Sequence, residues 1–310
     1  MIRIHILTEE EKNLQTNLTE IRVAEKEKLT QLIENEKSGW FKRANERLET
    51  FRKAKSYNEA SGIWSEIKEV YMRLQFHKCA YCEQKLEDKN IVHDVEHYRP
   101  KKNVRVWLND ERIKILGFDF NDTENNGYYL LPYNIFNYVT TCKHCNSSLK
   151  SDYFPIAGAR KNDSEAFDEI NSQENPFLIY PFGYIEEYAP EELLTFDGVL
   201  PIPHPSLTDD YLIKRVKVTI AFFDLATLRE TLIEERCEVI KGVLKAVDQI
   251  NESTDKEKIN EGKDELKIYC SPSSRHANCA NSYLQLCLNN EKKAIEIAKE
   301  AHKYLCQRRL

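Results

Sequence analysis

The chain carries two short cysteine pairs, Cys79-Ala80-Tyr81-Cys82 and Cys142-Lys143-His144-Cys145, and these decide the fold of its central part. Each pair forms a tight turn that presents both sulfur atoms to one side, so two pairs surround one zinc ion tetrahedrally. Such a closed site is structural, because no coordination position stays open for water. The sequence therefore predicts one structural Zn²⁺ with four thiolate ligands: Cys79, Cys82, Cys142 and Cys145.

The segment between the two pairs, residues 83–141, exceeds the usual spacing of a zinc ribbon and predicts a domain inserted between two zinc-binding turns. Ordinary buried cysteines or a redox pair are the alternatives. The other five cysteines form no close pair, and we interpret them as buried small apolar residues or free thiols. They are Cys237, Cys270, Cys279, Cys287 and Cys306.

The overall charge limits where this chain can bind nucleic acid. Its 310 residues, which suggest about two domains, carry a net charge of -6, so any basic face is local. The stretch 98–105 is the candidate, because it holds four positive charges and no negative ones. Within it we expect Arg99, Lys101 and Lys102 to contact phosphates, with a solvated basic loop as the alternative.

The start of the sequence, Met1-Ile2-Arg3-Ile4-His5, lacks the apolar stretch of a secretory signal. The sequence has no run of 18 apolar residues, so we expect no membrane span. We therefore expect a cytoplasmic protein without a membrane partner, in which Cys-x-x-Cys pairs bind metal rather than form disulfides.

The pattern along the chain predicts a mainly α fold with a small α+β core in three regions. Residues 1–76 are an N-terminal helical region without a catalytic motif, which we interpret as a scaffold or a partner-docking surface. Residues 77–155 hold the motifs, interrupted by the insert 103–135. Residues 156–310 are a C-terminal region of short strands followed by helices.

Local signals refine these regions. Thr8 and Glu11 have the spacing of a capping box, and further helices are expected from Trp40 past Phe51 and from Glu59 to Leu74. The segments 177–180 and 193–196 are strand candidates, the second ending in an Asp-Gly turn. Helical periodicity covers 208–250 with a break near 225–226, a polar loop is expected over 251–264, and a last helix over 281–306. The aromatic residues of the insert are expected to pack onto the core, with a substrate-facing loop as the alternative; they are Trp107, Phe118, Phe120, Tyr128 and Tyr129.

The stretch Asp94-Val95-Glu96-His97-Tyr98-Arg99-Pro100 lies between the cysteine pairs and carries candidate catalytic groups. Phosphodiester hydrolysis needs a base for water and a divalent cation at the scissile phosphate. A neutral imidazole suits the first role, and oxygen donors suit Mg²⁺ or Mn²⁺. His97 supplies the imidazole, and Glu96 and Asn146 supply oxygens. If 94–98 is a strand, Glu96 and His97 point to opposite faces, and a bend at Pro100 or a backbone carbonyl ligand would bring both to one site.

Glu96-His97, Asn137 and Asn146 beside the two cysteine pairs resemble the HNH endonuclease motif in its His-Asn-Asn form. That resemblance implies a ββα-metal core, a two-stranded hairpin followed by a helix, over residues 77–155. It makes His97 the general base and Asn137 the residue that holds the hairpin loop. Asn146 would bind the catalytic metal with Glu96 or its backbone, and Lys150, one turn on, would reach phosphate. The family more often has Asp at position 96 and His at position 146, and its His-to-Asn interval is shorter.

A narrower resemblance links the chain to the HNH subunits of Septu and retron-associated anti-phage systems. It is carried by Cys79–Glu83, by Glu96–Lys101, by the stretch Asn175-Pro176-Phe177-Leu178-Ile179-Tyr180-Pro181 and by the helical stretch from Thr219 to Arg236. The resemblance implies an ABC- or SMC-like ATPase partner that holds the nuclease inactive until infection. A retron-type complex would add a reverse transcriptase and its RNA–DNA product.

These observations predict a metal-dependent HNH endonuclease that cuts DNA, as the effector of a defence complex. A zinc-stabilised binding module without catalysis is one alternative, and it predicts that His97 and Asn146 are far apart or buried. A toxin that cleaves RNA such as tRNA is another. A free-standing restriction or homing enzyme would need a DNA-reading element such as a basic recognition helix, and the sequence has none.

Overall fold

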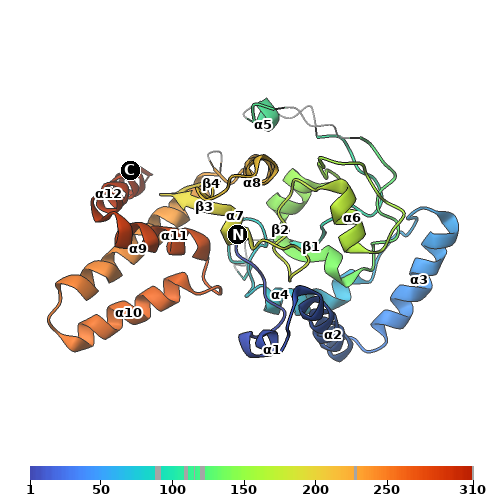
Figure 1. Cartoon of the computed structure of the whole chain (residues 1–310), viewed down its shortest axis with the longest axis horizontal. Coiled ribbons are helices and arrows are strands. Elements are labelled where there is room, and N and C mark those ends of the chain that lie inside the picture. The colour runs from blue at the N-terminus through green and yellow to red at the C-terminus, as the bar shows by residue number, and fades with distance from the viewer. Residues whose placement is uncertain (88–91, 108–110, 115, 119–122, 227–228, 309–310) are drawn as a thin grey trace. The chain divides into compact units, whose positions relative to one another are not determined.

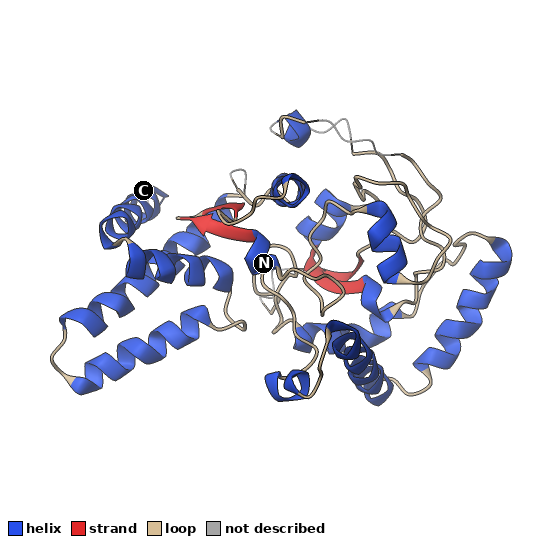
Figure 2. Ribbon diagram, in the orientation of Figure 1, coloured by secondary structure: helices blue, strands red, loops and turns tan. Residues whose placement is uncertain are grey.

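The computed structural model describes residues 1–87, 92–107, 111–114, 116–118, 123–226 and 229–308, and the chain is mainly helical with two small antiparallel sheets (Figures 1 and 2). It forms two compact units. The first, here the N-terminal unit, comprises residues 3–81 and 85–189; the second, the C-terminal unit, comprises 1–2, 82–84 and 190–310. The division of the chain into the three regions 1–76, 77–155 and 156–310 stays a prediction from the sequence. In the part of the chain that the structure describes, no helix has the length and apolar character needed to cross a membrane.

The N-terminal unit begins with helices that follow their capping signals. The predicted capping box is present: Thr8 Oγ1 accepts the Glu11 N–H at 3.2 Å and the Glu11 carboxylate accepts the Thr8 N–H at 2.9 Å. The expected helix at Glu59 begins later, at Trp64, because Ser61-Gly62 interrupts the pattern. The helices are α1 (Glu9–Asn13), α2 (Leu18–Glu36), α3 (Trp40–Ala54), the 3₁₀ turn η1 (Trp64–Ile67) and α4 (Lys68–Leu74).

Two strands and a helical segment form the centre of the N-terminal unit. Strand β1 (His93–His97) pairs antiparallel with β2 (Tyr138–Cys142), with His93 opposite Cys142 and His97 opposite Tyr138. The π-helical segment η3 (His144–Lys150) follows β2 directly. Helix α4 packs against β2, and η1 packs against β1. The chain therefore runs strand, strand, helix, although a long connection separates the two strands.

That connection, residues 98–137, contributes aromatic side chains to the interior. Trp107 and Tyr128 are buried, and the Tyr128 ring lies 5.9 Å from that of Phe154. This agrees with the expected packing onto the core, while Phe120 lies outside the described residues. The connection also holds the short helix α5 (Glu111–Lys114) and the 3₁₀ turn η2 (Ile135–Asn137).

The buried segment 177–180 is not a strand, contrary to the sequence pattern. It follows α6 (Phe167–Glu174), and Pro176 forms only an isolated bridge with Ile156. Proline has no N–H to donate, so Pro176 and Pro181 prevent a regular ladder on either side of this apolar run. The segment 177–180 is apolar because it is buried, and this apolar composition led to the strand prediction although the segment is not a strand.

The C-terminal unit contains a hairpin and a helical bundle. The Asp197-Gly198 turn joins β3 (Leu194–Asp197) to β4 (Leu200–Pro203), as predicted, and Gly198 has a φ of +63°. The expected break separates α8 (Asp210–Phe222) from α9 (Glu230–Glu252). The other helices are α7 (Pro190–Leu193), α10 (Lys256–Cys270), α11 (Ala277–Asn289) and α12 (Glu291–Arg308).

Two expectations for this unit were wrong. Residues 256–264 are helical rather than a loop, because Asp255 caps α10 by accepting the Glu257 N–H at 2.9 Å and the polar residues form its exposed face. The expected last helix is two helices, broken at Asn290, whose side chain accepts the Lys293 N–H at 3.1 Å and so begins α12.

Helix α9 packs against α10, α11 and α12, and two cysteines lie in this core. Burial raises the pKa of the Cys237 thiol to about 11 and that of Cys279 to about 12. Both thiols are protonated at neutral pH and pack as small apolar side chains.

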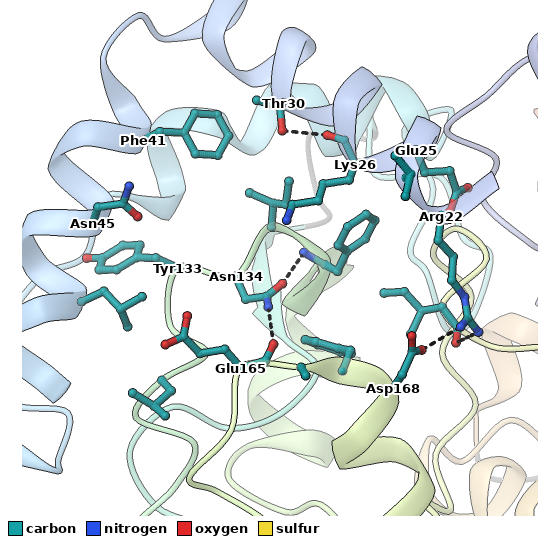
Figure 3. A pocket seen from close by; sticks show the side chains of 18 of the residues that line it. Arg22, Glu25, Lys26, Thr30, Phe41, Asn45, Tyr133, Asn134, Glu165 and Asp168 are labelled. Carbon is teal, nitrogen blue, oxygen red and sulfur yellow. Dashed lines mark hydrogen bonds and ion pairs between the residues drawn. The ribbon is translucent and has the colours of Figure 1, made fainter. Parts of the chain in front are cut away.

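A cavity of about 660 Å³ in the N-terminal unit is lined by α2, α3 and the segments 130–136 and 165–168 (Figure 3). Asn134 lies on its wall and donates to the Glu165 carbonyl, and Arg22 pairs with Asp168 at 2.9 Å. Glu25 also lines it, but its side chain is fully buried and accepts the Tyr184 N–H at 2.8 Å. Burial raises the pKa of Glu25 to about 7, although that hydrogen bond and the charges of Arg3 and Arg22 oppose the shift.

The raised pKa of Glu25 predicts a pH-dependent stability. Below about pH 4.5 both states carry the protonated acid; between about pH 4.5 and 7 only the unfolded chain ionises, so the folded state loses relative stability as pH rises. We expect the free energy of unfolding of Glu25→Gln, relative to that of the wild type, to increase by about 2 kcal/mol from pH 5 to pH 7.5. Urea unfolding at the two pH values measures this, and a constant difference would contradict it.

A second prediction concerns the ion pair between Arg99 and Glu174. Both side chains are fully buried, and the Arg99 Nε lies 2.9 Å from a carboxylate oxygen of Glu174. Glu174→Gln leaves the guanidinium without its carboxylate and is expected to cost about 3–5 kcal/mol of unfolding free energy. Glu111→Gln removes an exposed partner of Lys114 and is the matched control, expected to change nothing measurable. Equal unfolding midpoints for the two variants would refute the prediction.

Candidate functional site

The four cysteines predicted as zinc ligands lie together. Their sulfur atoms are all within 4.8 Å of one another, and all four residues are buried. Thiolates around a tetrahedral zinc ion with Zn–S bonds of about 2.3 Å lie about 3.8 Å apart, so the donor set and its spacing fit zinc. The Cys142 sulfur also accepts the Cys145 N–H at 3.5 Å, as expected of a metal-binding turn.

A buried glutamine attaches the first cysteine pair to β2. The Gln75 amide donates to the carbonyls of Lys78 (2.9 Å) and Thr140 (2.8 Å), and its oxygen accepts the Thr140 N–H at 2.7 Å. The Ala80 N–H also bonds the Thr140 carbonyl, at 3.1 Å. These bonds place the first pair beside the strand that ends in Cys142. This role was not predictable from the sequence, because a glutamine at a helix end follows no pattern.

His97, the candidate base, is buried at the end of β1 and has a defined tautomer. Its Nε2 lies 3.2 Å from the Pro132 carbonyl, which accepts only, so Nε2 carries the proton and Nδ1 has the lone pair. Burial lowers the pKa of His97 well below its ordinary value, and the charges of Lys101 and Lys150 act in the same direction. The ring is therefore neutral at pH 7, the form that accepts a proton.

Asn137 holds the ends of the long connection together. Its side-chain oxygen accepts the Arg99 N–H at 2.8 Å, and its amide nitrogen donates to the carbonyls of Arg99 (3.0 Å) and Leu131 (3.2 Å). Its own carbonyl accepts the Tyr98 N–H at 2.9 Å. The residue is fully buried, so these bonds fix the backbone directly after His97.

Glu96 points to the opposite side of β1 and meets η3. Its carboxylate forms an ion pair of 2.8 Å with Lys150, whose side chain is fully buried. Burial raises the pKa of Glu96, and the Lys150 ammonium opposes that shift. Asn146 lies four residues before Lys150 in the same helical segment and is half-buried. The segment that pairs with Glu96 thus also carries the second predicted metal ligand.

The lysines differ in their placement. Lys101 is half-buried, and burial lowers its pKa, while the charge of Glu96 raises it. The fields of Lys101 and Lys150 act on both Glu96 and His97, so the two neighbours share one electrostatic environment although they face opposite ways. Lys102 is exposed.

Arg99, like Lys150, is fully buried and paired with a carboxylate. Its guanidinium donates to Glu174 at 2.9 Å and to Asn171 at 2.7 Å, and it is fully buried. This contact ties the loop after β1 to α6 and leaves the positive charge compensated within the protein.

The N-terminal helical region contributes a side chain that the sequence did not suggest. The Trp64 ring of η1 lies 4.7 Å from the His97 ring, and the Tyr138 ring lies 5.1 Å from it, both nearly perpendicular. The cavity of Figure 3 is separate from this cluster, since neither Glu96 nor His97 lines it.

Comparison with known proteins gives one relative. The chain is 30% identical over 179 residues to the Septu protein PtuB of Bacillus mycoides (strain KBAB4), an alignment that covers 57% of this chain and 52% of that protein. The chain thus spans about half the length of the curated relative it matches. No family model and no solved structure matches the chain.

The four-cysteine cluster predicts that loss of one thiolate reduces metal content and stability together. Cys142→Ser is expected to lose most of the bound zinc and to lower the melting temperature by several degrees. Cys306→Ser, which changes an exposed cysteine in α12, is the matched control and should alter neither. Elemental analysis and thermal unfolding of both variants measure this; full zinc content in Cys142→Ser would contradict it.

Proposed function

We propose that the chain is a metal-dependent nuclease of the HNH kind that hydrolyses phosphodiester bonds, most simply those of DNA. The observation that carries this proposal is the placement of His97 at the end of β1, where its Nε2 lies 3.2 Å from the Pro132 carbonyl and leaves Nδ1 as the nitrogen that can accept a proton. Asn137 clasps the loop beside it, and β1, β2 and η3 follow the strand, strand, helix order of a ββα-metal unit. Similarity to a Septu protein supports the same conclusion.

In this mechanism His97 acts as the general base. With its Nε2 proton committed to Pro132, the ring can take a proton from water only at Nδ1. Asn137 acts through the backbone, because its bonds to Arg99 fix the chain next to His97. Tyr138 hydroxyl donates to the same Pro132 carbonyl and so helps to hold the acceptor in place.

The oxygens of Glu96 and Asn146 are the groups that would hold a catalytic Mg²⁺ or Mn²⁺. The fit rests on Glu96, a buried carboxylate whose partner in the structure is the Lys150 ammonium. That ammonium already supplies the positive neighbour, so a metal ion would bind there by taking its place beside the carboxylate. When bound, the metal supplies charge neutralisation at the scissile phosphate and the leaving oxygen.

Substrate phosphates would be held by Lys101 and Lys102, on the loop after β1. Lys150 was expected there too, but it is fully buried and paired with Glu96, so it would have to leave that ion pair to reach a phosphate. Arg99 was also expected among the phosphate ligands. We now propose that it acts in the scaffold, because its guanidinium is buried against Glu174 and Asn171.

Similarity to PtuB leads us to propose a role in an anti-phage defence complex of the Septu type, in the cytoplasm. In such a complex an ABC- or SMC-like ATPase subunit would control cleavage, and a retron context would add a reverse transcriptase and its RNA–DNA product. A net charge of -6 agrees with a subunit that relies on a partner for targeting, since the chain has little overall attraction for nucleic acid.

A zinc-stabilised binding module without catalysis is the second candidate. The burial of Glu96 and His97, which are 6% and 4% exposed, favours it, because substrate must reach a catalytic base. The two candidates are separated by a cleavage assay. The chain, alone and co-purified with the product of the neighbouring gene, is incubated with Mg²⁺ or Mn²⁺ and with plasmid DNA, single-stranded DNA or tRNA. Cleavage of tRNA alone would indicate an RNA-cleaving toxin, and no cleavage of any substrate would refute the nuclease.

His97→Ala removes the proposed base and is expected to reduce the cleavage rate by about 10²- to 10⁴-fold, with folding and zinc content unchanged. The control is His93→Ala, which changes the histidine four residues earlier in the same strand and should retain activity. Rates in a clean preparation, circular dichroism and zinc content are compared. Undiminished cleavage by folded His97→Ala would exclude the assigned base.

A further inference from the structure

Trp64 connects the N-terminal helical region to the candidate base. Its ring lies 4.7 Å from the His97 ring at an interplanar angle of 87°, a favourable edge-to-face arrangement. The Lys101 ammonium lies 4.6 Å from the centroid of the same indole, within the range of a cation–π interaction. One side chain thus contacts both the proposed base and a lysine of the basic loop.

The position of the indole is fixed by its surroundings. A Cβ atom at Gly62 would lie 1.7 Å from a Trp64 ring carbon, so only glycine lets the ring occupy this place. The backbone next to it is held by Trp40, whose indole N–H donates to the Ile63 carbonyl at 3.0 Å. The Tyr133 ring, next in sequence to Pro132, lies 6.1 Å from that of Trp64.

The consequence for His97 is steric. Trp64 and Tyr138 each pack nearly perpendicular to the imidazole, and the Pro132 carbonyl holds Nε2. A flip of the ring would exchange Nδ1 with a carbon atom and break the bond to Pro132. Loss of the indole removes one of the two aromatic neighbours that oppose this motion and frees the Lys101 ammonium.

We propose that Trp64 is a positioning residue of the active site, which orients the His97 ring and holds the Lys101 side chain, so that the N-terminal helical region completes the site. The inference rests on the proposed nuclease function for its kinetic consequences. Its structural content, the orientation of His97 by Trp64, stands apart from catalysis.

The test uses four variants of the full chain, with its partner if activity requires one. Trp64→Leu removes the aromatic ring, Trp64→Phe keeps an aromatic face, and Gly62→Ala keeps the indole but displaces it. Ser65→Ala changes the exposed neighbour of Trp64 and is the control. Steady-state kcat and KM for the best substrate are measured, together with the NMR signals of the His97 ring nitrogens, which report which nitrogen carries the proton and which His97→Ala identifies by their absence.

We expect Trp64→Leu and Gly62→Ala to lower kcat by about 10- to 100-fold with a smaller change in KM, because misplacement of a catalytic group acts on the chemical step. The His97 ring nitrogens should lose the single Nε2–H tautomer in both variants, and Trp64→Phe should restore part of kcat. Unchanged kcat and an unchanged His97 signal in folded Trp64→Leu would overturn the proposal, as would equal losses in Ser65→Ala. If the wild type cleaves no substrate, the nuclease fails, and the NMR signal alone decides whether Trp64 orients His97.

Discussion

The hydrogen bonds of the Asn137 side chain are the constraint on which the candidate site depends. They join the residues that follow β1 to those that precede β2, across a connection of 40 residues from His97 to Asn137. Closing a loop of that length costs more conformational entropy than closing a short turn. Three bonds to backbone groups in a fully buried position offset this cost locally, because a buried backbone group without a partner destabilises the fold. The two strands therefore keep the register that places His97 opposite Tyr138.

Electrostatics sets a second constraint. Glu96 and Lys150 are buried as a pair, and removing either partner would leave a charge in a medium of low dielectric. The pairing fixes η3 against the Glu96 face of β1, while His97 on the other face stays neutral. Glu96 and His97 thus contact different groups but lie in the field of the same two lysines, and a carboxylate and an uncharged base coexist there.

Features with a local signal were predictable from sequence, and those that depend on distant contacts were not. The cysteine spacing led to the four-sulfur cluster, and the Asp197-Gly198 turn and the Thr8 cap follow from backbone chemistry. Gln75 and Trp64 carry no local pattern, since their roles come from segments more than 30 residues away. The apolar run 177–180 suggested a strand because burial and sheet pairing favour the same residues, and Asn290 shows that one cap can divide a continuous periodic pattern.

Strand β2 links the four-cysteine cluster to the candidate site around His97. It begins at Tyr138, which packs against His97, and ends at Cys142, one of the four clustered cysteines. Five residues of extended chain span about 13 Å, and their side chains are all buried. A metal bound by the cysteines would fix one end of this rigid strand, and Asn137 fixes the other. Such a metal would therefore help to orient the His97 imidazole through β2.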